Sequence, residues 1–100
     1  MSKRFYQIVK SAKPVLVDFY ADWCIACRLM PPVLKEVKNQ YKDKVRIIKV
    51  NVDHYPDIAM SYQIQNIPAI VLFQEGKIKW SGIGVQKATD ISLAIKEILP

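Results

Sequence analysis

Apolar residues change their spacing along this chain, and each change marks a boundary between predicted elements. Near the N-terminus they recur at helical spacing, which predicts an amphipathic helix over residues 3–12. The continuous apolar run Val15–Tyr20 is β-branched and aromatic, and predicts a buried strand. Helical spacing then returns and continues to Tyr41, with lysines on the opposite side. Pro32 lies in the first turns of this second helix and is expected to kink its axis.

Strands and helices are also predicted to alternate in the second half of the chain, which contains a hairpin of two strands before the last helix. The pattern predicts, in order, a strand rich in Val and Ile, a short helix that begins at a proline, two strands joined by a turn, and a C-terminal helix: 45–52, 56–62, 69–73, 77–82 and 91–99. Strands that alternate with helices pair in parallel, and the final hairpin adds an antiparallel strand. The expected fold class is α/β, with a mixed sheet between helices on both faces, in a single domain over residues 1–100.

The composition of the chain limits which class of protein this is, where it is located and which partners it binds. Apolar residues make up 51% and charged residues 24% of the chain, as in ordinary globular proteins, and no apolar run approaches the ~20 residues that span a bilayer. The N-terminus lacks the apolar core of a signal peptide, so we expect a cytoplasmic protein with no membrane partner. The formal net charge of +6 favours solubility and attraction of acidic partners. Basic and aromatic residues are not interleaved as in nucleic-acid platforms, so no nucleic-acid partner is expected.

The only two cysteines, Cys24 and Cys27, lie between the first predicted strand and the helix that follows it. At the start of a helix, unpaired N–H groups and the helix dipole favour an anion, and the reactive form of cysteine is the thiolate. A second thiol that can close a small ring suits the pair to thiol–disulfide exchange. The alternatives are an inert buried pair or half of a zinc site. No second cysteine pair or histidine pair could complete four metal ligands, so no metal is expected.

Asp18 is the one charged residue within the apolar run Val15–Tyr20. If this carboxylate is buried, it loses hydration and its pKa should rise. If the side chain faces solvent, it is an ordinary strand residue. The residues alone leave both interpretations open.

Short motifs at fixed spacing connect these features across nearly the whole chain. In order they are Val17–Cys24, Cys27 followed by Arg28, Pro32, Val50–Asp53, Ile67-Pro68, Phe73 with Gly76, and Gly84. Together they resemble the thioredoxin family, and the resemblance implies the thioredoxin fold. Members usually begin with a strand before the first helix, which is not seen here. The sheet is therefore expected to have four strands in the order 45–52, 15–20, 69–73, 77–82, flanked by four helices.

The resemblance also assigns catalytic roles to individual residues. It makes Cys24 the attacking thiolate and Cys27 the resolving thiol of a redox-active disulfide. It makes Asp18 a buried base behind Cys27, and it places Lys49 near that carboxylate. A surface strand lysine is the competing interpretation of Lys49.

A second group of residues is expected to contact the substrate. Pro68 matches the family's cis proline, which would turn the backbone of Ile67 toward an incoming peptide. Trp23, beside the nucleophile, fits an exposed apolar contact surface. Ile25 and Ala26 replace the usual Gly-Pro between the cysteines, which gives position 26 an N–H that can point at the Cys24 sulfur. This N–H is expected to lower the pKa of Cys24 and make the disulfide more oxidising, an effect that outweighs desolvation of the thiolate by Ile25.

The predicted function is a thiol–disulfide oxidoreductase that reduces protein disulfides without a bound cofactor. Its electrons are expected to come from a thioredoxin-reductase-type donor. The alternatives are a more oxidising thiol oxidase or disulfide isomerase of the same fold, and a non-catalytic interaction subunit. We expect a monomer, and the charges of Arg46 and Lys49 on the 45–52 edge strand are of the kind that discourages strand addition.

Overall fold

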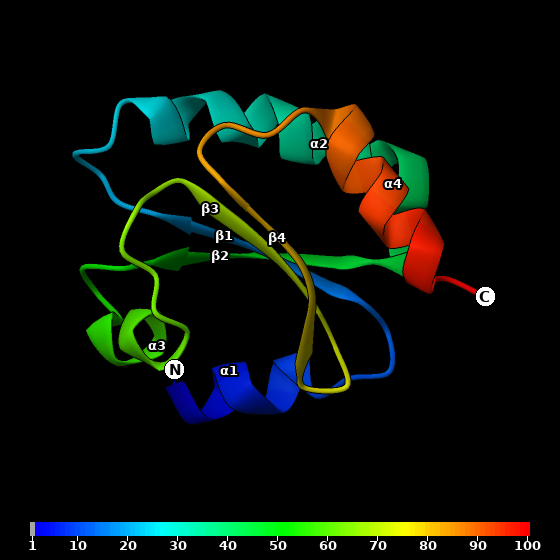
Figure 1. Cartoon of the computed structure of the whole chain (residues 1–100), viewed down its shortest axis with the longest axis horizontal. Helices are drawn as coiled ribbons and strands as arrows, with labels where there is room; N and C mark the ends of the chain where they lie inside the picture. Colours follow the sequence, from blue (N-terminus) through cyan, green and yellow to red (C-terminus); the bar gives the residue numbers. More distant parts are fainter. Residues whose placement is uncertain (1) are drawn as a thin grey trace.

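A mixed sheet between two layers of helices forms the centre of the molecule (Figure 1). The computed structural model describes residues 2–100. Within them the sheet has four strands in the order β2-β1-β3-β4, with bounds β1 (Val15–Tyr20), β2 (Arg46–Asn51), β3 (Ala69–Gln74) and β4 (Lys77–Ile83). β1 pairs in parallel with β2 and antiparallel with β3, and β3 and β4 form the hairpin. The predicted fold class and strand order are both confirmed.

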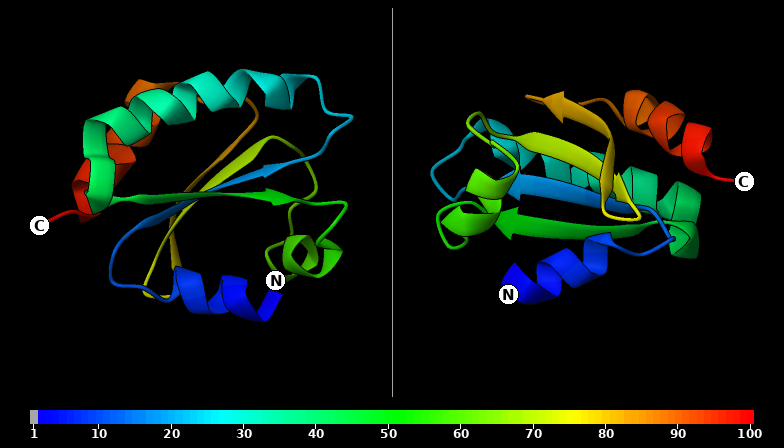
Figure 2. Two further views of the ribbon diagram at one scale, coloured as in Figure 1. Left: turned by 180° about the vertical axis from the view of Figure 1, so that it is seen from behind. Right: turned by 60° about the horizontal axis from the view of Figure 1, so that its bottom comes forward.

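The helices divide between the two faces of the sheet (Figure 2). One face is covered by α2 (Met30–Tyr41) and α4 (Ala88–Ile98), and the other by α1 (Ser2–Val9) and α3 (Pro56–Ser61). Two short 3-10 segments, η1 (Ala26–Leu29) and η2 (Lys42–Lys44), precede and follow α2. None of the helices within residues 2–100 is long and apolar enough to cross a membrane.

Alternate residues of β1 belong to two separate cores. Leu16 packs toward α2 and α4, whereas Val15, Val17 and Phe19 pack toward α1 and α3. Successive side chains of a strand point to opposite faces of the sheet, and helices cover both faces here. Side chains on either face of β1 are therefore buried. This explains why β1 has a continuous apolar run and not an alternating pattern.

Phe5 fixes α1 against the sheet. Its ring is fully buried and lies edge-on to Tyr62 and Phe73, with centroids 5.9 Å away in both cases, and 6.4 Å from the ring of Phe19. Aromatic pairs at these separations contribute beyond the apolar area that they bury. The N-terminal helix is therefore held by aromatic packing.

Two predicted helix boundaries differ from the structure. The first helix ends at Val9, earlier than predicted, because the chain turns so that backbone carbonyls of Val9 and Ser11 accept N–H groups of Gly76 and Glu75 in the β3–β4 turn. The C-terminal helix begins at Ala88, earlier than the predicted start at residue 91. Pro32 lies in the first turn of α2, where missing N–H groups cost little, and the kink expected at this proline stays a prediction.

Replacement of Phe5 by alanine should lower the free energy of unfolding by about 3–5 kcal/mol, because it leaves a cavity among three aromatic rings. Urea denaturation measures this loss. Leu93→Ala, at a side chain that is 61% exposed, is the control and should change stability by no more than about 0.5 kcal/mol. Equal effects of the two substitutions would contradict the assigned role of Phe5.

Candidate active site

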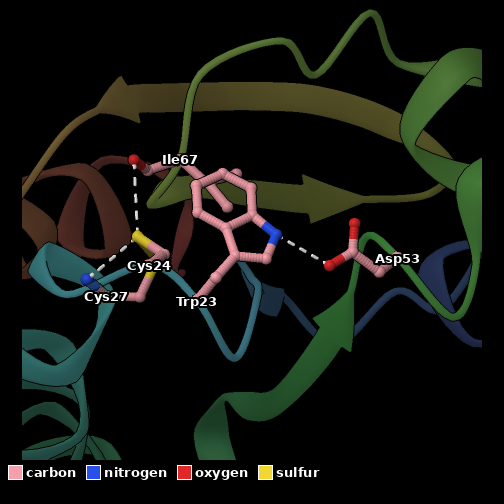
Figure 3. Close-up of a disulfide and its surroundings, with 5 residues drawn as sticks. All are labelled: Trp23, Cys24, Cys27, Asp53 and Ile67. Atoms are coloured by element: carbon pink, nitrogen blue, oxygen red, sulfur yellow. Dashed lines mark hydrogen bonds between the residues drawn. A yellow bond between two sulfur atoms is a disulfide. The ribbon is translucent and has the colours of Figure 1, made fainter.

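The two cysteines form a disulfide where the chain leaves β1 and enters η1 (Figure 3). The Cα atoms of Cys24 and Cys27 lie 5.3 Å apart. The Cys24 N–H donates to the carbonyl oxygen of Ala21 at 3.2 Å, and the Cys27 N–H points at Cys24 Sγ, also at 3.2 Å. Cys24 thus precedes the first helical turn, as predicted, and its sulfur faces a backbone donor. A donor in this position stabilises negative charge on the sulfur.

The N–H directed at the Cys24 sulfur belongs to Cys27 and not to Ala26, contrary to the sequence-based expectation. Cys27 is the second residue of the 3-10 segment that follows the N-cap Ile25, and its N–H is one of the donors without a backbone partner at the start of that segment. No hydrogen bond from Ala26 to this sulfur is found in the described chain. The side chain of Ile25 is 76% exposed and is therefore largely solvated.

The peptide bond between Ile67 and Pro68 is cis, as predicted, and it lies against the disulfide. The Ile67 carbonyl oxygen is 3.8 Å from Cys24 Sγ (Figure 3), which is van der Waals contact because a disulfide sulfur carries no proton. The Pro68 carbonyl oxygen accepts the N–H of Gly84 at 2.8 Å. This bond holds the loop after β4 beside the cis proline.

Trp23 lies on the surface, with 68% of its area exposed, but it is not free to rotate. Its indole Nε1 donates to Asp53 Oδ2 at 2.8 Å (Figure 3). Asn51 Oδ1 in turn accepts the backbone N–H groups of Asp53 and His54, at 2.9 and 3.3 Å. We did not predict this role of Asp53. The sequence feature that could have indicated it is Asn51 at the end of a strand, because an asparagine side chain commonly caps the turn that follows it.

Exposed apolar side chains beside the cysteine loop extend the apolar surface formed by Trp23. The register of β1, β3 and β4 aligns Phe19, Ala69 and Ile83, so the cysteine loop, the cis proline and the loop after β4 emerge together. Ile83 and Val85, on either side of Gly84, are both substantially exposed. Sequence reasoning missed these two positions, because isolated apolar residues near a glycine carry no distinctive pattern.

Asp18 is fully buried behind the disulfide, which excludes the solvent-facing interpretation. It lines a cleft of about 210 Å³ with residues from β1, β2 and the cysteine loop: Tyr20, Ala21, Asp22, Cys24, Cys27, Arg28, Pro31 and Lys49. Neither carboxylate oxygen has a hydrogen-bond partner among the described residues. Burial raises the pKa of Asp18 to about 6, and the positive charge of Lys49 opposes part of this rise.

Lys49 combines features of both interpretations that the sequence left open. It is the register partner of Asp18 on the neighbouring strand, and its charge acts on that carboxylate. Its side chain is also exposed, and Nζ lies 4.7 Å from the centroid of the Tyr20 ring. The ammonium group therefore sits at the mouth of the cleft over an aromatic face, a cation–π arrangement that the sequence did not predict.

Known proteins match both the sequence and the fold. The sequence model of the thioredoxin family matches residues 1–97. This chain belongs to the thioredoxin family. A thioredoxin-like protein of Synechocystis sp. is 44% identical over 81 residues, which cover 81% of this chain and 77% of that protein. A thioredoxin of Acidithiobacillus ferridurans is 42% identical over 77 residues, or 77% of this chain and 71% of the relative.

A solved thioredoxin structure shares the fold of this chain. The oxidized form of mitochondrial thioredoxin 3 from Saccharomyces cerevisiae superposes with a TM-score of 0.85 at 33% identity, covering 96% of this chain and 89% of that chain. Membership of the thioredoxin family and the Cys24–Cys27 disulfide together support a thiol–disulfide oxidoreductase. Within residues 2–100, no group of three or more His, Cys, Asp or Glu side chains is arranged to hold a metal ion.

Replacement of Asp18 by asparagine should stabilise the oxidised protein, and the gain should depend on pH. The folded carboxyl keeps its proton up to about pH 6, whereas an unfolded one loses it near its ordinary pKa of 3.8. This group therefore lowers the stability of the natural protein progressively between about pH 4 and 6, and by a constant amount above that range. A neutral amide carries no such penalty, so the gain from Asp18→Asn should reach roughly 2–3 kcal/mol at pH 7.

Urea denaturation at pH values from 4 to 8 measures this difference. Asp22→Asn removes the same charge from an exposed position and provides the control, with no comparable slope expected. A gain at Asp18 that is constant over this range would contradict a raised pKa.

Proposed function

We propose that this member of the thioredoxin family reduces disulfides in other proteins, with Cys24 attacking and Cys27 resolving. The observation that carries the proposal is the position of Cys24 Sγ, which meets the Cys27 N–H on one side and the Ile67 carbonyl on the other. A peptide bound along that carbonyl can bring its own disulfide to Cys24.

The reaction consists of two exchanges of sulfur–sulfur bonds. In the first, the Cys24 thiolate attacks a substrate disulfide, a bond forms between Cys24 and one substrate sulfur, and the other substrate sulfur leaves and takes a proton from water. In the second, Cys27 loses its proton and attacks the sulfur of Cys24. The intramolecular disulfide forms, the second substrate sulfur leaves, and the substrate has gained two electrons that the dithiol has lost.

Asp18 is proposed to accept the proton of Cys27. The two residues line the same cleft, and a carboxyl with a pKa of about 6 is a stronger base than an ordinary aspartate, yet remains largely ionised at neutral pH. Lys49 is proposed to keep that carboxylate charged, because its ammonium group acts against the effect of burial.

The substrate is proposed to lie across Trp23, Ile25, Ala26 and the cis proline. Trp23 and Ile25 provide exposed apolar area, and Ala26 is exposed beside them. The backbone of Ile67, turned by Pro68, can hydrogen-bond an extended chain in the manner of an added strand. Electrons would return to the pair from a thioredoxin-reductase-type donor, which closes the cycle.

Reduced protein should cleave the disulfides of insulin, and Cys24→Ser should abolish this activity because the attacking sulfur is gone. Cys27→Ser should also lose turnover, but it should accumulate a covalent complex with substrate because the resolving step is missing. Non-reducing electrophoresis detects that complex. If Cys24→Ser formed the complex and Cys27→Ser did not, the roles would be reversed.

A more oxidising oxidase or isomerase remains the alternative, and the Ile25-Ala26 dipeptide is the feature that favours it. Equilibration with a dithiothreitol or glutathione series distinguishes the two. Reductase couples lie at about −270 mV and strong oxidase couples at about −120 mV, and we expect this pair at the reductase end. A Gly-Pro variant at positions 25 and 26, measured in parallel, isolates the contribution of the dipeptide. A potential above about −180 mV would replace the reductase proposal with its alternative.

A further inference from the structure

The outer edge of β2 carries backbone groups that no other strand within residues 2–100 uses. The N–H groups of Arg46 and Val52 donate to carbonyls of Pro14 and Tyr20 on the side of β1, both at 2.9 Å. In a parallel pair, alternate residues of a strand bond to the same neighbour. The backbone groups of Ile47 and Lys49 consequently face away from β1.

The side chains of the same two residues line a groove of about 330 Å³ between β2 and α2. Four residues of α2, spaced so that they share one helix face, complete it: Pro31, Leu34, Lys35 and Lys38. We call this the β2 groove. Three of its six lining residues are apolar and three are lysines, and no acidic residue lines it. Glu36, the one acidic residue of α2, lines a different groove against α4.

The lysine at the far end of the β2 groove is held in place. Lys38 Nζ donates to the carbonyl oxygens of Lys42 and Val45, at 2.8 and 3.0 Å. Lys35 and Lys49 are exposed along the length of the groove. The surface therefore combines outward backbone groups, an apolar floor and positive charge on a single strip.

We propose that the β2 groove docks an extended acidic segment of a partner protein, which adds to β2 as a further strand. Its backbone pairs with Ile47 and Lys49, and every second side chain points over the groove. An apolar side chain there contacts Pro31 and Leu34, and carboxylates two residues to either side reach the lysines. This pattern is acidic, apolar, acidic at alternate positions of the partner segment.

Charge selects this occupant over a second copy of the chain. Two β2 edges placed together would bring Arg46 and Lys49 of one copy against the same basic residues of the other, and inward or edge lysines oppose such pairing. The same basic residues would attract the carboxylates of an acidic strand. The positive residues thus discourage self-association and admit a complementary partner.

The inference rests on the proposed function, because the β2 groove adjoins the redox site. Pro31 and Lys49 line both the groove and the cleft that contains Asp18 and Cys27. β2 runs parallel to β1 and ends at Asn51, whose side chain positions the partner of Trp23. A protein anchored at Ile47 is held about 13 Å along the strand from that end, so its disulfide must lie on a separate segment.

A titration of the oxidised, ¹⁵N-labelled chain tests the docking site without any redox step. The probe is the peptide acetyl-Glu-Thr-Val-Thr-Glu-Thr-amide. Its controls replace both glutamates by lysine, or all three threonines by proline, which removes the N–H groups that pair with Ile47 and Lys49 when the segment lies parallel to β2. We expect the acidic peptide to shift the amide resonances of Ile47, Lys49 and Lys35, and neither control to do so.

Lys35→Glu should weaken binding of the acidic peptide roughly fivefold. Lys79→Glu makes the same charge change on the opposite edge strand and should leave affinity unchanged.

Several results would overturn the inference. One is a shift pattern confined to Trp23, Ile67 and Gly84, and another is equal binding of the acidic and proline peptides. An oligonucleotide that shifts the same amides more strongly than the peptide would indicate general polyanion binding. Dimerisation through β2 in sedimentation velocity would assign the edge to a second copy. Insulin reduction by Lys35→Glu should equal that of the natural chain, so loss of peptide binding and failure of the reductase proposal remain distinguishable.

Discussion

Helices pack on both faces of β1 and strands pair with both of its edges, so every side chain from Val15 to Phe19 is buried. This enclosure determines the chemistry at the end of the strand. Asp18 projects into the layer between the sheet and α2, where neither of its oxygens finds a hydrogen-bond donor among the described residues. The cysteine loop begins three residues further along, so the unsolvated carboxyl and the disulfide share one cleft. The central position of β1 thus determines both where the Asp18 carboxyl lies and why its pKa is raised.

α2 links the two surfaces that this structure presents. Its N-terminal side, reached through η1, supports the Cys27 N–H that faces Cys24 Sγ. One of its faces, from Pro31 to Lys38, forms a wall of the β2 groove. A helix packed against the sheet by Leu34 and Val37 behaves as a rigid connection between these sites. Contacts with a partner at one surface are therefore made in fixed geometry relative to the other.

The sequence allowed the fold to be predicted because its signals are local. The apolar run of β1, the alternation in β2 and the hairpin turn each follow from residues within a few positions of one another. The end of α1 could not be predicted, because the carbonyls of Val9 and Ser11 are satisfied by the distant β3–β4 turn. Likewise, Asp53 gained its role through a contact with Trp23, thirty residues earlier in the chain. The donor to the Cys24 sulfur was expected at Ala26 and lies at Cys27, because the conformation of the cysteine loop decides which unpaired N–H at the start of η1 meets the sulfur.

The hydrogen bond between Gly84 and the carbonyl of Pro68 joins the loop that enters β3 to the loop that leaves β4, at the open end of the hairpin. Gly84 adopts a φ of +86°, a backbone conformation that side chains disfavour, so this position is suited to glycine. The link means that the surface beside the disulfide is ordered before any substrate arrives. Less conformational entropy is then lost on association, and binding free energy that would otherwise fix two loops remains available to hold the substrate. A receptor surface prepared in this way can be small and still select an extended chain.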